Sequence, residues 1–198
     1  MKRIKLLVAC EESAVVREAF AKHGVDAWSC DIKPSRIPGQ HIQGDVRPIL
    51  YKRWDAVIAH PPCTRLCNSG VRWLHERNLW ADLDDAAALF RACLFANAPH
   101  IAVENPIMHR HAKERIRMEP TQIIQPWQFG HGETKATCLW LRGLPKLTPT
   151  NIVPGREHRV HKMPPGKDRS TERSVTYQGI ADAMAEQWIR HIESTQGA

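Results

Sequence analysis

The stretch IKLLVACEESAVVREAFAKHGVDAWSC, residues 4–30, decides the fold of this 198-residue chain. Residues 4–9 form an apolar, β-rich run, and residues 14–24 then carry apolar side chains at helical spacing up to a glycine, which is typical of a helix end. Residues 26–30 indicate a second strand. This order predicts two parallel strands joined by a helix.

The alternation of strands and helices continues along the chain. Further strands are expected at 41–46, 55–60 and 100–105, helices at 83–98 and 176–192, and a late strand pair at 121–127 and 137–141, joined by a turn that contains glycine. We therefore predict one α/β domain over residues 1–198, with a doubly wound, mostly parallel sheet and an antiparallel edge strand.

The composition sets limits on the class of protein. Hydrophobic residues make up 42% and charged residues 25% of the chain, which is ordinary for a globular domain. No run of 18 apolar residues is present, and the apolar run at the start is too short for a signal peptide, so a cytoplasmic location is expected. Six scattered cysteines then predict free thiols. The net charge of +7 favours a polyanionic partner such as nucleic acid.

Polar side chains stand where the predicted strands end. They are Asp31, Asp45, the run from His60 to Cys63, and the pair Glu104 and Asn105. Because ligands of doubly wound sheets bind beyond the carboxyl ends of the strands, these residues predict a functional site at that edge.

Cys63, which follows two prolines, allows three interpretations. It could be a buried apolar thiol, although the prolines force a rigid extended turn that lifts it from the sheet. It could bind metal with His60 and Cys67, but no second ligand pair at similar spacing is present. It could be a nucleophile, with Glu104 at the next strand end as the acid that polarises the substrate.

The segments around these residues resemble the DNA cytosine-C5 methyltransferases, and most closely their short, phage-encoded members. The resemblance lies in HPPC at 60–63, VENP at 103–106, VACEESAVVREAF at 8–20, SCD at 29–31, GDV at 44–46, FGHGETKAT at 129–137 and YQGIADAM at 177–184. These segments occur in the family's order. The resemblance implies a Rossmann-like methyltransferase sheet, S-adenosyl-L-methionine as cofactor, DNA as partner, no metal, and the cytoplasm of a bacterial host as location if the chain is phage-encoded.

The resemblance also implies roles for individual residues. Cys63, on the loop with Pro62, would add to C6 of cytosine so that C5 can take the methyl group. Glu104 would bind N3 and the exocyclic amine, and Asn105 would hold the Pro-Cys loop. The cofactor would contact Asp31 through its ribose and Asp45 through its adenine amine. The other implied cofactor residues are Ala9, Cys10, Glu11, Ser13, Ile32, His60 and Pro61, and His60 could also favour the thiolate.

The segment 143–175, rich in proline and charge, is expected to be a loop that stands where the family has its large target-recognition domain. Lys135 and Thr137 would touch the nucleic-acid backbone near the target. The other phosphate contacts would come from Arg65, Arg72, Arg77 and the loop residues Arg156, Arg159, Lys162, Lys167 and Arg169. Phosphate contacts position a backbone without reading sequence, so low sequence specificity is expected. The target base would be flipped out of a duplex or already single-stranded.

Two alternatives remain open. The same chemistry could act on RNA or on a free cytidine nucleotide, which suits the small size of the chain. The chain could instead be an inactive nucleic-acid-binding protein with a methyltransferase fold, because Glu12, Ala14 and Val15 stand where the family's first loop has flexible backbone.

Overall fold

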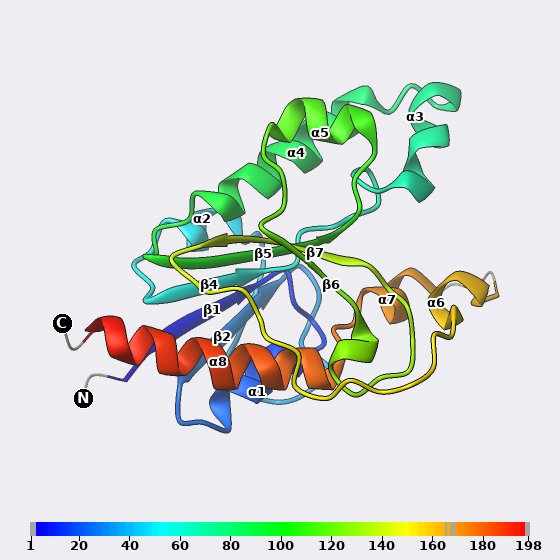
Figure 1. Ribbon diagram of the computed structural model, residues 1–198. Coiled ribbons are helices and arrows are strands. Elements are labelled where there is room, and N and C mark those ends of the chain that lie inside the picture. Colours follow the sequence, from blue (N-terminus) through cyan, green and yellow to red (C-terminus); the bar gives the residue numbers. More distant parts are fainter. Residues whose placement is uncertain (1–2, 165, 167–168, 197–198) are drawn as a thin grey trace.

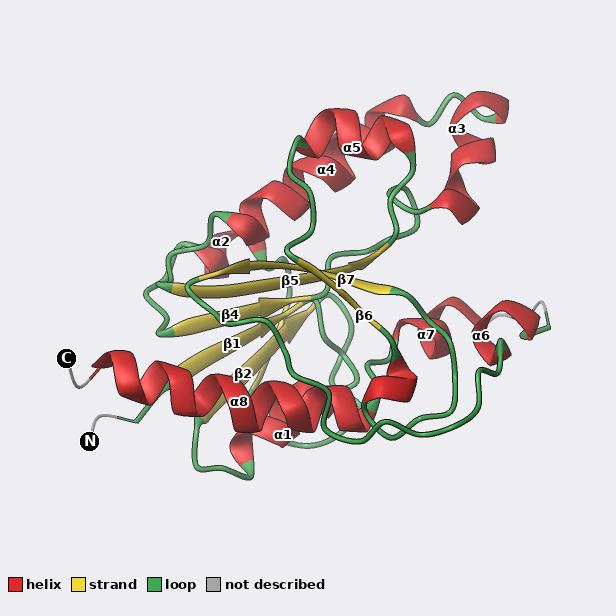
Figure 2. Ribbon diagram, in the orientation of Figure 1, coloured by secondary structure: helices red, strands yellow, loops and turns green. Residues whose placement is uncertain are grey.

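The computed structural model describes residues 3–164, 166 and 169–196 and contains one twisted seven-stranded sheet (Figures 1 and 2). The strands lie in the order β3-β2-β1-β4-β5-β7-β6. Their bounds are β1 Lys5–Ala9, β2 Asp26–Asp31, β3 His41–Gln43, β4 Ala56–Ala59, β5 His100–Pro106, β6 Gln122–Ile124 and β7 Thr137–Arg142. The predicted α/β class with a mostly parallel, doubly wound sheet is confirmed.

Strands β1 to β5 pair in parallel, whereas β7 runs antiparallel to both of its neighbours. The antiparallel part of the sheet therefore lies at the predicted edge and consists of β7 and the short outer strand β6. The strand order reverses between β1 and β4, which makes the carboxyl ends of these two strands the topological switch point.

Helices cover both faces of the sheet (Figure 1). Their bounds are α1 Val15–Ala21, α2 Arg47–Leu50, α3 Val71–Glu76, α4 Trp80–Leu94, α5 Arg110–Ile116, α6 Arg159–Lys162, α7 Arg169–Ser174 and α8 Gln178–Gln196, with 3₁₀ turns η1 Asn68–Gly70 and η2 Pro126–Gln128. Helices α2, α4 and α5 lie on one face, over a core that includes Phe90 and Trp140. Helices α1 and α8 lie on the other face, over Phe20, Met184 and Trp188.

Several element boundaries differ from the sequence expectations. Helix α4 begins at Trp80 and ends at Leu94 instead of spanning 83–98, since the backbone of Asn97 bonds to Leu50 and Trp54. Strand β3 stops at Gln43, before Gly44 with its φ of +155°. Strand β6 ends at Ile124, and Pro126 then begins the turn η2.

The expectation that the segment 143–175 is entirely loop is wrong for part of its described residues. The segment contains the short helices α6 and α7, which lie beyond the carboxyl ends of the strands (Figures 1 and 2). Helix α3 lies beyond the same edge on the opposite side of the sheet (Figure 1). Of the helices in the described ranges, none combines the length and apolar character that crossing a bilayer requires.

Candidate active site

The loop after β4 holds Cys63 at the carboxyl edge of the sheet. Asn105 on β5 is 1% exposed and donates a hydrogen bond from Nδ2 to the carbonyl oxygen of Pro61, at 2.9 Å. Beyond Cys63 the chain forms a tight turn, because the amides of Leu66 and Cys67 both donate to the Cys63 carbonyl oxygen. The loop is thus fixed from both ends, and Cys63 remains partly exposed.

A small residue closes this turn. A Cβ atom at Gly70 would lie 2.0 Å from the carbonyl oxygen of Thr64, which no side chain could accept without movement of the backbone. The compactness of the loop therefore depends on a glycine at this position.

His60 and Glu104 form a nearly buried pair beside Cys63. The Nδ1 atom of His60 lies 2.8 Å from Oε2 of Glu104, and the two side chains are 11% and 10% exposed. Burial alone would lower the pKa of His60, but the hydrogen bond to Glu104 and its charge raise that pKa above the ordinary value. Burial likewise opposes ionisation of Glu104, yet His60 and Lys135 hold its pKa below the ordinary value. The two shifts agree and describe an imidazolium–carboxylate pair.

Cys67 lies against Cys63. The metal interpretation grouped these two thiols, whereas the interpretation of Cys63 as a nucleophile gave Cys67 no role. A hydrogen bond between the two thiols and burial raise the pKa of Cys63, and the same thiol–thiol bond lowers the pKa of Cys67. The Sγ atom of Cys67 is also 3.0 Å from Oγ of Ser69. Their spacing of four residues, closed by the turn at the Cys63 carbonyl oxygen, brings the two thiols together.

A small pocket lies between the carboxyl end of β5, the start of β7 and the start of α8. It is lined by Glu104, Lys135, Thr137, Thr176, Tyr177, Ile180 and Met184. The hydroxyl of Tyr177 donates to Glu133 at 2.7 Å, and burial together with this bond raises the pKa of Tyr177 to about 12. Lys135 donates to the carbonyl oxygen of Val175. The pocket therefore places a carboxylate and a lysine close together.

The first loop, between β1 and α1, takes a shape that glycine usually provides. Cys10 and Ala14 have φ angles of 59° and 65°, in the left-handed region. The buried carboxylate of Glu11 accepts the amides of Val16 and Arg17, at 2.7 and 3.2 Å. The predicted cofactor residue Glu11 thus binds the first turn of α1, and Ser13 donates to the same carboxylate.

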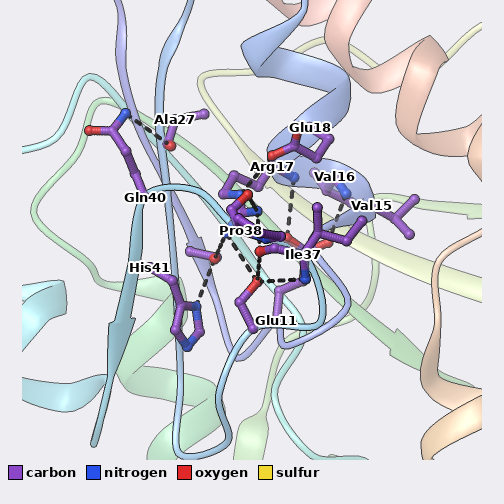
Figure 3. Close-up of polar contacts among 12 residues, drawn as sticks. Glu11, Val15, Val16, Arg17, Glu18, Ala27, Ile37, Pro38, Gln40 and His41 are labelled. Carbon is purple, nitrogen blue, oxygen red and sulfur yellow. Dashed lines mark hydrogen bonds and ion pairs between the residues drawn. The ribbon is translucent and has the colours of Figure 1, made fainter.

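Two arginines connect the first loop and α1 to the loop after β2. The guanidinium of Arg17, which is 1% exposed, donates to the carbonyl oxygens of Ile37 and Pro38 (Figure 3). It also donates to the hydroxyls of Ser29 and Ser35. Arg36 makes a bidentate ion pair with Glu12. Sequence reasoning missed Arg17, because nothing local to the helix shows that a charged side chain is buried.

The remaining predicted cofactor residues lie along the same edge of the sheet. Asp31 ends β2, and its Oδ1 accepts the amide of Lys33 at 2.9 Å, while the neighbouring Ile32 is 74% exposed. The carboxylate of Asp45 accepts the amide and the guanidinium of Arg47, which hold its pKa low. Ala9 is buried at the end of β1.

The predicted nucleic-acid residues are not all free to bind. Thr137 is buried, and its hydroxyl donates to Lys135. Arg65 pairs with Asp82, and Arg159 pairs with Glu133 at 2.8 Å. The remaining candidates differ in exposure and contacts: Arg156 is exposed and stacks over Trp127 at 3.9 Å, Lys162 is exposed, and Lys167 lies outside the described residues.

The metal interpretation of Cys63 gains no support from the side-chain geometry. Within the described part of the chain, no three His, Cys, Asp or Glu side chains are grouped so that they could hold a metal ion.

Comparisons with known proteins give distant likenesses among solved structures. No protein-family model and no curated protein matches the chain. Among solved structures, the Entamoeba histolytica methyltransferase EhMeth aligns with a TM-score of 0.46 and 13% identity, over 77% of this chain and 58% of that one. The S. pombe Dnmt2 methyltransferase aligns with a TM-score of 0.43 and 14% identity, over 80% of this chain and 54% of that one. The chain thus spans little more than half the length of either protein, and its fold class rests on its own strand order.

Proposed function

We propose that this protein is an S-adenosylmethionine-dependent methyltransferase that methylates C5 of cytosine in DNA through a covalent Cys63 adduct, a compact enzyme of the kind that phages encode. The observation that carries the proposal is the grouping of Cys63, Glu104 and Asn105 at one edge of the sheet. Asn105 fixes the Pro-Cys loop, and Glu104 lies on the same strand, one residue earlier.

The residues at the ends of β1 and β2 fit the cofactor. Asp31 has a carboxylate oxygen, Oδ2, without a hydrogen-bond partner within the described ranges, and it can accept ribose hydroxyls. The exposed side chain of Ile32 offers an apolar surface beside it. The left-handed backbone of Cys10 and Ala14 lets the first loop bend as a glycine-rich loop does. When bound, S-adenosylmethionine supplies the methyl group.

The side chains of the site can perform the remaining chemistry. The sulfur of Cys63 adds to C6, which makes C5 nucleophilic. Glu104 binds N3 and the exocyclic amine and stabilises the charge that develops on the ring. The C5 proton then passes to solvent water, and the Cys63 sulfur leaves C6 as a thiolate with the bonding pair, which restores the aromatic ring.

The charge of the chain supports a nucleic acid as the substrate. The net charge is +7, and exposed cations such as Arg156 and Lys162 lie near α6, beyond the edge that carries the site. Base chemistry on a duplex requires that the target be flipped out or single-stranded. The segment 143–175 is too short to hold a large recognition domain, so we expect low sequence specificity.

One observation favours an alternative, an inactive nucleic-acid-binding protein. The Glu11 carboxylate accepts hydrogen bonds from the amides of Val16 and Arg17 at the start of α1. Glu11 lies in a loop where the resemblance implies cofactor contacts, so this carboxylate is already engaged within the protein. Calorimetric titration with S-adenosylmethionine separates the two functions, because an inactive fold of this type would bind no cofactor.

DNA that contains 5-fluorocytosine tests the covalent step. Fluorine cannot leave C5 as a proton does, so the native protein with S-adenosylmethionine should remain bonded to this DNA through Cys63. Cys63→Ser should abolish the adduct and methyl transfer while it still binds the cofactor. Cys67→Ser serves as the control and should still form the adduct. Full methyl transfer by Cys63→Ser would exclude the proposed nucleophile.

The substrate class is tested separately with labelled S-adenosylmethionine. Methyl incorporation into DNA, RNA and dCMP is compared under the same conditions. Incorporation into DNA alone is expected, and incorporation into RNA or dCMP alone would move the assignment to that substrate.

A further inference from the structure

The histidine next to the Pro-Cys loop has an unusual position in the sheet. His60 follows β4 directly, and its amide donates to the carbonyl oxygen of Ala9 at the end of β1, at 2.9 Å. It therefore lies at the topological switch point, between the first loop and the Glu104 end of β5. The ring of His60 reaches across to β5, because its Nδ1 atom lies 2.8 Å from Oε2 of Glu104.

The other nitrogen of the ring has no partner. Nε2 of His60 is buried and makes no hydrogen bond within the described ranges. If the ring is an imidazolium, this buried N–H is an unsatisfied donor, which is unfavourable. The charged ring is thus held by a single bond, to Glu104, and release of its proton costs less than from a ring bonded at both nitrogens.

Three charged groups face His60 from the elements around it. Glu104 on β5 and Glu11 on the first loop favour the protonated ring, and Lys135, before β7, opposes it. Glu104 in turn raises the pKa of Cys63 by its charge, whereas Lys135 lowers it. The negative charge of Glu104 therefore disfavours the thiolate form of Cys63. Protonation of Glu104 would remove this effect.

We propose that His60 and Glu104 act as one acid with a single shared proton, and that His60 supplies the proton that Glu104 passes to the pyrimidine ring. This inference rests on the proposed function and adds a positioning residue that acts through Glu104.

The proton and electron balance of the step is complete. The Cys63 thiol passes its proton to the neighbouring Cys67 thiolate, whose pKa is lowered. The Cys63 sulfur then forms a bond to C6, the C5–C6 π pair moves to C4–C5, and the C4–N3 π pair moves to N3. The proton of Nδ1 passes to the Glu104 carboxylate and from there to N3, so His60 becomes neutral and Glu104 is again a carboxylate. When Cys63 leaves, the proton returns from N3 through Glu104 to His60. The 2.8 Å bond allows this transfer without movement of either side chain.

The first experiment measures the ionisation of His60 directly by NMR of histidine-labelled protein. We expect His60 in the native protein to titrate above 6.5, its ordinary pKa, because of Glu104. In Glu104→Gln the carboxylate is lost and burial dominates, so the pKa of His60 should fall below 6.5. A native His60 that titrates at or below 6.5, or that is unchanged in Glu104→Gln, would overturn the shared proton.

The second experiment follows the rate of adduct formation on 5-fluorocytosine DNA against pH. His60→Gln keeps an amide donor near Glu104 but holds no transferable proton, so we expect a loss of about 100-fold in rate. In the native protein the rate should fall as the pH rises through the pKa of His60, because the proton that His60 supplies is then lost. This fall should be absent in His60→Gln.

A buried histidine at the start of β5, the strand that carries Glu104, provides the control. His100 begins β5, is 7% exposed, and bonds through Nδ1 to the carbonyl oxygen of Gly143. His100→Gln should keep the native pH profile even if it lowers stability. A native-like profile in His60→Gln would overturn the relay. If His60 titrates as expected but the native protein traps no cytosine, the proposed function fails while the proton-sharing pair stands.

Discussion

At the scale of single residues, the contact between Cys63 and Cys67 determines where a negative charge rests. Ionisation of one of two touching thiols opposes ionisation of the other, so the pKa of Cys63 is raised while that of Cys67 is lowered. Ser69 and the backbone amides of Ser69 and Gly70 stabilise the anion of Cys67. Cys63, the proposed nucleophile, therefore carries less of the charge than its neighbour in the free protein.

This contact predicts that Cys67→Ser makes Cys63 more reactive. Without the competing thiol, the pKa of Cys63 should fall, and each unit of that fall raises its thiolate fraction about tenfold at a fixed pH. The measurement is the rate of iodoacetamide alkylation of each cysteine between pH 6 and 10, followed by peptide mass spectrometry. In the native protein Cys67 should react first.

A second variant tests the cause of this preference. Ser69→Ala removes the hydroxyl donor of Cys67 and should slow alkylation of Cys67 at low pH without changing its burial. Preferential alkylation of Cys63 in the native protein would contradict the assignment of the charge.

The sequence predicts the location of the site residues better than it predicts their contacts. Polar residues that follow apolar strands can be placed at the sheet edge from local pattern alone, as for Asp31 and Glu104. The bond between His60 and Glu104 joins residues 44 positions apart, and it depends on side-chain rotamers that no periodicity encodes. The burial of Arg17 was missed for the same reason, since its partners lie in a loop far along the chain.

At the scale of elements, the start of α8 depends on one close backbone contact. A Cβ atom at Gly179 would lie 1.9 Å from the carbonyl oxygen of Phe129, so the helix can approach the loop after η2 only with a glycine at this position. The amide of Gly179 also donates to Nε2 of His131 at 3.1 Å. The pocket beside Glu104 is lined by Tyr177, Ile180 and Met184, and therefore depends on this contact.

We expect Gly179→Ala to destabilise the protein by about 1–3 kcal/mol, the usual cost of overpacking, because the backbone must move. Urea denaturation measures the change. Gly166→Ala is the matched control, since a Cβ atom there meets no other atom within 4 Å. Equal stability of the two variants would show that α8 shifts away from Phe129 at little cost.

The boundaries of elements were the part of the fold least accessible from sequence. Helix α4 is displaced toward its N-terminus from the expected bounds, because Asn97 pairs with a distant segment instead of continuing the helix. Helices α6 and α7 have no strong apolar period, and their stability depends on surrounding contacts such as the pair of Arg159 and Glu133.

At the scale of the whole molecule, alternation of strands and helices predicted the class of fold but not the order of the strands. Local pattern shows that β1 to β5 are parallel-type strands, yet their neighbours are set by long-range packing on two faces. The position of β7 between β5 and β6 likewise follows from pairing across the sheet. The overall charge of +7 belongs to this scale, because it acts on a partner through the summed field.

The basic segment 154–173 holds six basic against three acidic residues, a net charge of +3, and we propose that it tracks phosphates. Arg156 and Lys162 are exposed, whereas Arg159 is paired with Glu133. Arg156→Gln with Lys162→Gln should therefore weaken binding to all DNA sequences alike. It should also reduce the slope of log K against log salt by about 0.7–0.9 for each phosphate that is no longer neutralised. Arg159→Gln should change the slope less, because its charge is already offset.

Filter binding of labelled DNA at several salt concentrations measures these slopes, with Arg190→Gln on α8 as the control. Arg190 is 77% exposed and pairs with Glu186 at 4.0 Å. It lies in the C-terminal half of α8, which runs away from the carboxyl edge of the sheet (Figure 1), so its removal should leave the slope unchanged. Cofactor affinity should not change in any of these variants. A weakening that depends on DNA sequence would mean that the segment reads bases. An unchanged slope in the double variant, together with activity that disappears only on a free nucleotide, would instead identify the nucleotide as the substrate.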